Sequence, residues 1–81
     1  PRTIEIEVSE DGGIYISRLK LSEKQLLGIL QGSVGRYGQG IPVVFYGDGR
    51  ARHSHISRVM DICGRAGLHS FSFAAFKEKG E

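Results

Sequence analysis

The chain has 81 residues, of which 40% are hydrophobic and 25% are charged, and its formal net charge is +2. A chain of this size forms one domain with a modest core, so we expect residues 1–81 to be a single domain. The single cysteine excludes an intrachain disulfide, the small net charge argues against a strongly basic nucleic-acid binder, and no apolar run is long enough to cross a membrane.

The first predicted element is a β-hairpin. Apolar residues alternate with glutamates between Ile4 and Val8, which is the period of a strand with one face in water. Residues 11–13 (Asp-Gly-Gly) form a turn signal between this run and a second alternating run. The pattern therefore predicts strands at residues 2–8 and 14–18.

A helix follows the hairpin. Ser22 and Gln25 have the spacing of a capping box, in which each side chain accepts a hydrogen bond from the backbone of the other. Leucines and a valine then recur every three or four residues, which predicts a helix over residues 23–34. Glycines are frequent over residues 32–40, and we expect them to stop this helix and form a flexible link.

The second half of the chain predicts a strand, a helix and a strand. The apolar run over residues 41–46 is typical of a buried strand. Apolar residues at helical spacing follow, with Ser54 as the expected N-cap and Gly64 or Gly67 as the expected stop. Residues 69–76 predict the last strand.

The predicted order of elements is thus β-β-α-β-α-β, which indicates a mixed α/β fold of the α+β type. We expect a two-layer sandwich in which a mixed sheet carries both helices on one face. The unit over residues 41–76 should be a right-handed parallel crossover. Residues 77–81 are expected to be a frayed tail.

The sequence offers no set of residues for catalysis or metal binding. His53 and His55 are two positions apart, so on a helix they point in different directions. Cys63 falls on the apolar face of the second helix and should be buried and inert. Asp48 follows the central strand, where its side chain is suited to hold a turn. We therefore expect no enzyme, no cofactor and no metal.

The arginines allow an alternative interpretation as a small basic α/β domain that binds nucleic acid. They lie in the second half of the chain, at Arg50, Arg52, Arg58 and Arg65. A sheet that binds RNA normally presents stacking aromatic residues at fixed strand positions. The chain does not match that pattern, so nucleic acid is the alternative function and no nucleic-acid partner is expected.

The second half of the chain resembles the ExbD/TolR family. The resemblance rests on the apolar strand ending in Asp at residues 42–48, on the helix segment 56–61 (ISRVMD) and on Gly67 before the last strand. The alternating first strand and the Ser-led helix are similar too, so the resemblance covers nearly the whole chain. One departure is Gly47, where the family usually carries Ala. In the following turn, Arg52 and His53 stand where Pro and an aromatic residue are common.

This resemblance implies a role in a membrane-energised machine. Family members carry one transmembrane helix with a proton-handling Asp, which we expect outside this chain, and a periplasmic domain. The domain would sit at the periplasmic face of the bacterial inner membrane and form a homodimer. Its partners would be an ExbB- or TolQ-like membrane protein through the missing helix, a TonB- or TolA-like protein, and peptidoglycan in the TolR branch. The proton motive force would drive the complex.

The last strand suggests how partners could bind. It is apolar, without a charged residue, and an open edge of this kind accepts another strand. We expect the dimer or partner-binding edge to consist of Ser70, Phe71, Ser72, Phe73, Ala74 and Ala75. On this hypothesis, proline at position 72 should abolish association.

Overall fold

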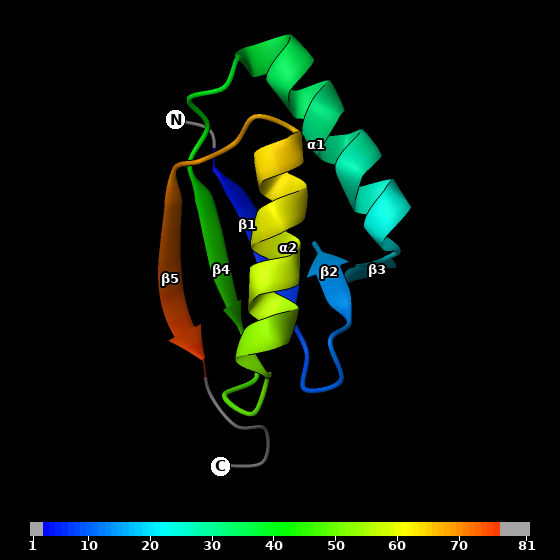
Figure 1. Cartoon of the computed structure of the whole chain (residues 1–81), viewed down its shortest axis with the longest axis vertical. Coiled ribbons are helices and arrows are strands. Elements are labelled where there is room, and N and C mark those ends of the chain that lie inside the picture. Colours follow the sequence, from blue (N-terminus) through cyan, green and yellow to red (C-terminus); the bar gives the residue numbers. More distant parts are fainter. Residues whose placement is uncertain (1–2, 77–81) are drawn as a thin grey trace.

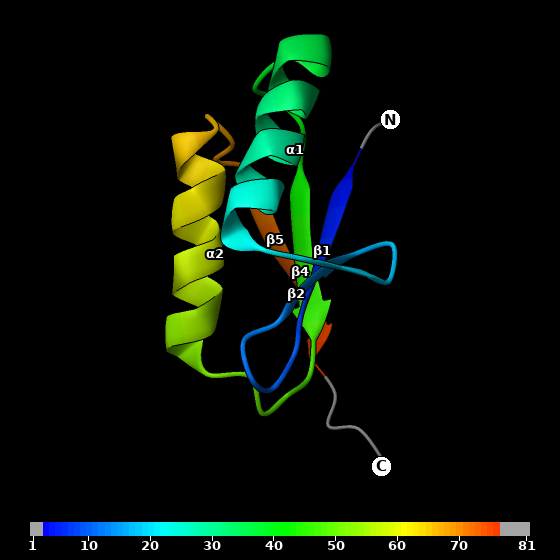
Figure 2. The same ribbon diagram turned by 90° about the vertical axis from the view of Figure 1, so that its right-hand side faces the viewer.

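A mixed five-stranded sheet carries both helices on one of its faces (Figure 1; Figure 2). The computed structural model describes residues 3–76, so the predictions for Arg2 and for the tail at residues 77–81 lie outside the described residues. The strands and helices in chain order are β1 (Ile4–Val8), β2 (Ile14–Ile16), β3 (Leu19–Leu21), α1 (Glu23–Tyr37), β4 (Val43–Gly47), α2 (His53–Arg65) and β5 (Phe71–Phe76).

The sheet has the strand order β3-β2-β1-β4-β5. The strands β1, β4 and β5 are parallel, whereas β2 and β3 are antiparallel to their neighbours. Figure 1 shows α2 in front of the sheet, with β5 on the side of β4 that makes the β4–α2–β5 crossover right-handed. The predicted fold class, the order of the predicted elements and the position of both helices are confirmed.

One short strand, β3, is added to the predicted order. The second strand of the hairpin ends at Ile16, and a two-residue turn leads into β3, with Ile16 opposite Leu19. Both turn residues have positive φ angles, 50° at Ser17 and 67° at Arg18. Tight hairpin turns of this kind usually contain Asn or Gly, so the prediction of one strand over residues 14–18 was wrong at its end.

The helix α1 begins as predicted and ends later. Ser22 Oγ accepts from the Gln25 N–H at 3.1 Å, and Gln25 Oε1 accepts from the Ser22 N–H at 2.8 Å, which confirms the capping box. The helix continues to Tyr37, so the glycines at 32 and 35 are helical and the predicted link starts too early. Buried Leu26 and Leu30 hold this helix against the core, and such packing outweighs the low helix propensity of glycine.

The helix α2 begins one residue before the predicted cap. Its N-cap is Arg52, which makes no capping hydrogen bond with its side chain, so the prediction for Ser54 was wrong. The helix passes through Gly64 and ends at Arg65. Gly67 follows with a φ of 94°, a conformation that glycine adopts without strain.

One hydrophobic core lies between the sheet and the helices. Its buried side chains come from every layer, with Ile6, Val8, Val43 and Phe45 from the sheet, Leu26 and Leu30 from α1, and Val59, Ile62 and Cys63 from α2. No helix within residues 3–76 is long and apolar enough to span a bilayer.

Candidate functional site

The strand β5 forms one edge of the sheet, and it contains the residues that the sequence predicts for partner binding. Ser70 directly precedes β5, and residues 71–75 lie within it. The Ser70 carbonyl accepts from the Val43 N–H at 2.8 Å. Backbone groups alternate in direction along a strand, so the N–H and C=O of Ser72 also point toward β4. Those of Phe71 and Phe73 therefore point to the free edge.

Aromatic side chains cover the helix-side face of this edge. Phe45 is fully buried on β4, and its ring centroid lies 5.6 Å from that of Phe71 and 5.5 Å from that of Phe73. Phe73 nevertheless remains 56% exposed. Ser72 and Ala74 are exposed as well. The β5 edge thus presents open backbone groups beside an exposed aromatic ring that rests on the core.

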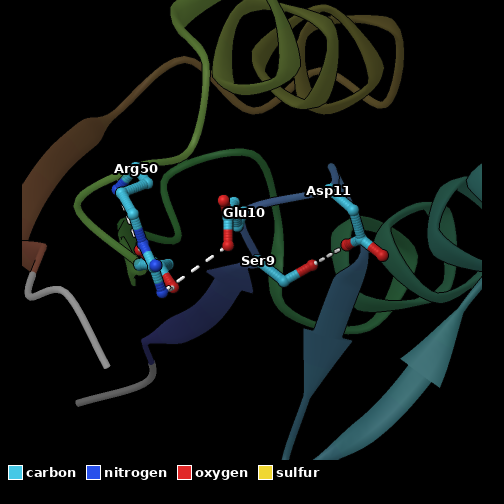
Figure 3. A network of polar contacts seen from close by, with 5 residues as sticks. Ser9, Glu10, Asp11 and Arg50 are labelled. Atoms are coloured by element: carbon cyan, nitrogen blue, oxygen red, sulfur yellow. Dashed lines mark hydrogen bonds and ion pairs between the residues drawn. The ribbon is translucent and has the colours of Figure 1, made fainter. Parts of the chain in front are cut away.

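The turn after β4 is held by Asp48, whose side chain is only 3% exposed. Asp48 Oδ1 accepts from the Arg50 backbone N–H at 2.8 Å and from Arg50 Nε at 3.1 Å. Asp48 Oδ2 accepts from Arg50 Nη2 at 3.1 Å. The same Nη2 lies 3.5 Å from Glu10 Oε2 (Figure 3). Arg50 therefore connects the turn after β4 with the turn after β1.

The turn after β1 has its own hydrogen bonds. Ser9 Oγ donates to Asp11 Oδ1 and accepts from the Gly13 N–H at 2.8 Å. The Ser9 hydroxyl, and after it the Gly13 N–H, lower the pKa of Asp11 below its ordinary value because both stabilise the carboxylate. Figure 3 shows Ser9 and Asp11 side by side next to Glu10 and Arg50.

A cavity of about 820 Å³ lies between these two turns. Besides the residues just described, Tyr15, Arg52 and His55 line it. The Nδ1 atom of His55 is buried without a hydrogen-bond partner among the described residues. The carboxylates of Asp48 and Glu10 already pair with Arg50, so much of the charge in this cavity is compensated internally.

The arginines predicted as a basic patch lie in different places. Arg50 and Arg52 line the cavity between the turns. Arg58 pairs with Glu23 of α1, and Arg65 lies at the end of α2 beside α1. The structure therefore does not bring the four guanidinium groups together as one nucleic-acid surface.

The remaining candidate groups for chemistry are also separate. His53 is exposed, whereas His55 lines the cavity. Within residues 3–76 no group of three His, Cys, Asp or Glu side chains could hold a metal ion. Cys63 is fully buried, and burial raises the pKa of its thiol to about 11, so the thiol stays protonated at neutral pH.

Two features of the turns were missed by the sequence reasoning. The first is the Arg50–Glu10 pair, because its partners are 40 positions apart and only the opposite charges of the two turns hinted at it. The second is the close approach of Gly47 to β1. A Cβ atom at Gly47 would lie 2.1 Å from the Val8 carbonyl oxygen, so only glycine fits without a backbone shift.

A comparison with known protein families identifies the family of this chain. The family model described as biopolymer transport protein ExbD/TolR matches residues 1–78, which is nearly the whole chain. No curated protein sequence matches the chain. The chain therefore belongs to the ExbD/TolR family, whose members are components of energy-transducing biopolymer transport complexes.

Proposed function

We propose that this chain is the periplasmic partner-binding and dimerisation domain of an inner-membrane complex driven by the proton motive force, of the ExbB-ExbD-TonB or TolQ-TolR-TolA type. Family membership supports the transport role. The observation that carries the binding role is the open β5 edge, with its exposed Phe73. In this proposal the chain acts by binding and not by catalysis. The partners are a TonB- or TolA-like protein, with peptidoglycan in the TolR branch.

The β5 edge sets the register of an added strand. The outward N–H and C=O groups belong to Phe71 and Phe73, so an incoming strand forms its hydrogen bonds with these two residues. In an antiparallel pair of two copies, Phe71 would lie opposite Phe73 of the second copy, and the two-fold axis would pass beside Ser72. Cross-strand aromatic pairs of this kind stabilise a sheet by roughly 0.2–1 kcal/mol each.

This register also changes the position at which a proline substitution tests the edge. The N–H of Ser72 points toward β4, so proline at position 72 would remove a hydrogen bond inside the sheet and would not block the edge specifically. Proline at position 73 removes an outward N–H. Proline is tolerated on an edge strand when its nitrogen faces solvent.

The test compares Phe73→Pro with Phe73→Ala. Both variants lose the aromatic ring, but only the proline variant loses the outward backbone donor. We expect the proline variant to bind a second copy, and a peptide from the TonB- or TolA-like protein, much more weakly than the alanine variant does. Analytical ultracentrifugation measures the dimer, fluorescence anisotropy measures the peptide, and circular dichroism verifies the fold. Equal association of two folded variants would contradict the proposed edge.

A further inference from the structure

A second cavity, of about 300 Å³, lies beside the first half of β1, on the side away from β5. Four segments supply its walls, namely β1, the β2–β3 hairpin, α1 and β4. The side chains that matter here are Ile4, Glu5, Ile16, Ile29, Ser33 and Tyr46. None of them belongs to the β5 edge or to the cavity between the turns, so this is a separate site.

The cavity exists because the sheet is incomplete on this side of β1. The strand β2 pairs with β1 only at Glu7 and Val8. Among the described residues, the first half of β1 therefore has no strand on its β2 side, although β1 pairs with β4 along its whole length. In Figure 2 the β2–β3 turn projects from the sheet on the side opposite α2. The projecting hairpin leaves space between itself, β1 and α1.

Hydrogen-bond acceptors gather at this space. The Ile4 N–H donates to the Pro42 carbonyl at 3.0 Å, so the alternation along β1 directs the N–H and C=O of Glu5 to the unpaired side. The carboxylate of Glu5 is exposed, and within residues 3–76 no cation forms an ion pair with it. The hydroxyls of Ser33 and Tyr46 are further acceptors.

The other walls are apolar and partly open. Ile29 remains 43% exposed on α1, while Ile4 and Ile16 are half-buried. Tyr46 contributes a half-buried aromatic ring from β4. The cavity thus combines an apolar wall, an aromatic ring and a carboxylate that has no ion-pair partner within residues 3–76. A long side chain with an apolar stem and a cationic end matches this combination.

We propose that this cavity binds an arginine side chain from a partner polypeptide. The methylene stem packs against the isoleucines, and the guanidinium pairs with Glu5 and lies against Tyr46. Arginine fits better than lysine because its planar group can bond several separate acceptors and stack on an aromatic ring. The larger cavity between the turns is less suitable, because Arg50 already pairs with its carboxylates Asp48 and Glu10.

The test uses two small probes, Nα-acetyl-arginine amide and its neutral isostere Nα-acetyl-citrulline amide. Titration is followed by NMR of labelled isoleucine methyl groups. We expect the arginine probe to shift the methyl signals of Ile16 and Ile29 in a saturable way, and added salt to weaken its binding. The citrulline probe should shift the same signals less. Equal binding of the two probes, or shifts at other isoleucines alone, would overturn the proposal.

A matched pair of variants locates the charge. Glu5→Gln and Glu7→Gln remove the same charge from the same strand and the same face, but only Glu5 lines the cavity. Exposed ion pairs contribute up to about 1 kcal/mol, so Glu5→Gln should weaken the arginine probe by up to about fivefold. Glu7→Gln should leave its affinity unchanged. If both variants weakened the probe equally, long-range charge and not this cavity would explain the binding.

Discussion

The two halves of the sheet differ in how firmly they are joined. In the parallel half, β1 and β4 pair along their whole length, and β5 continues this pairing beneath α2. In the antiparallel half, the β2–β3 hairpin joins β1 only through Glu7 and Val8. The parallel half therefore provides a rigid support for the β5 edge, while the junction with the hairpin leaves space for the cavity beside Glu5. Five changes of decreasing expected effect test this difference.

The largest loss of stability should come from Gly47→Ala at the end of β4. Gly47 has a φ of 149°, and an added Cβ would lie 2.1 Å from the Val8 carbonyl oxygen. We expect the free energy of unfolding to fall by about 3 kcal/mol or more. Chemical denaturation measures it. Gly40→Ala is the control, because a Cβ there meets open space. Equal effects of the two substitutions would refute the close approach.

The next effect should come from Asp48→Asn in the turn after β4. The asparagine amide carries no charge to balance that of Arg50, and it has one acceptor oxygen where the carboxylate has two. The buried side chain therefore loses its ion pair and one of its hydrogen bonds with the Arg50 guanidinium. We expect a loss of about 2 kcal/mol by the same measurement. The control is Asp61→Asn on the exposed face of α2, which should change stability little. A similar loss in both variants would show that the turn does not depend on Asp48.

The third prediction concerns alkaline pH and the thiol under α2. The pKa of Cys63 rises to about 11 in the folded chain from an ordinary value of 9.0, because burial disfavours the thiolate. The unfolded chain therefore loses this proton first. The contribution of the Cys63 thiol to the free energy of unfolding should be fully present below pH 9. It should be lost between pH 9 and 11, and the loss should be on the order of 2 kcal/mol. Denaturation of Cys63→Ala over the same range should lack this part of the decline, and a decline of unchanged size would contradict the assignment.

A change in the antiparallel half should have the opposite sign. Ser17 and Arg18 both have positive φ angles, which cost energy for residues other than Gly and Asn. Replacing them together, with Ser17→Asn and Arg18→Gly, supplies the usual pair for this hairpin turn. We expect the free energy of unfolding to increase by about 1 kcal/mol and the melting temperature to rise. No gain would mean that the turn is not a source of strain.

The smallest effect should come from the contact between the two helices. Arg58 of α2 pairs with Glu23 of α1, but the two side chains are 70% and 47% exposed. Exposed pairs are weak in water. We expect Arg58→Gln to change the free energy of unfolding by less than about 0.5 kcal/mol, and added salt to remove the difference. A larger loss would show that the ion pair, and not the buried leucines, holds α1 in place.

The sequence predicted the parts of the fold that depend on hydrophobic periodicity. The alternation from Ile4 to Val8 and the helical spacing of the leucines after Ser22 place β1 and α1 correctly. The β3 strand was missed because Ser17 and Arg18 carry none of the usual turn residues. The last residues of α1, from 35 to 37, were missed because the frequent glycines over residues 32–40 predicted an earlier end of the helix.

The candidate site was predictable to a smaller extent. The apolar composition of residues 71–76 indicated an edge strand. Which backbone groups face outward depends on the register with β4, and that register appears only in three dimensions. The Arg50–Glu10 pair and the cavity beside Glu5 likewise depend on segments that are distant in sequence.

The short β3 edge has a consequence for the size of the assembly. This edge has only three residues, with exposed Lys20 in its centre and exposed Arg18 before it, and such an edge discourages pairing. Of the two outer strands within residues 3–76, β5 is therefore better suited than β3 to pair with another copy. Two copies joined through β5, as proposed above, would use identical surfaces and would leave no second edge of the same kind among the described strands. Such a contact would be isologous and closed, so growth would stop at two chains and would not continue into a fibre.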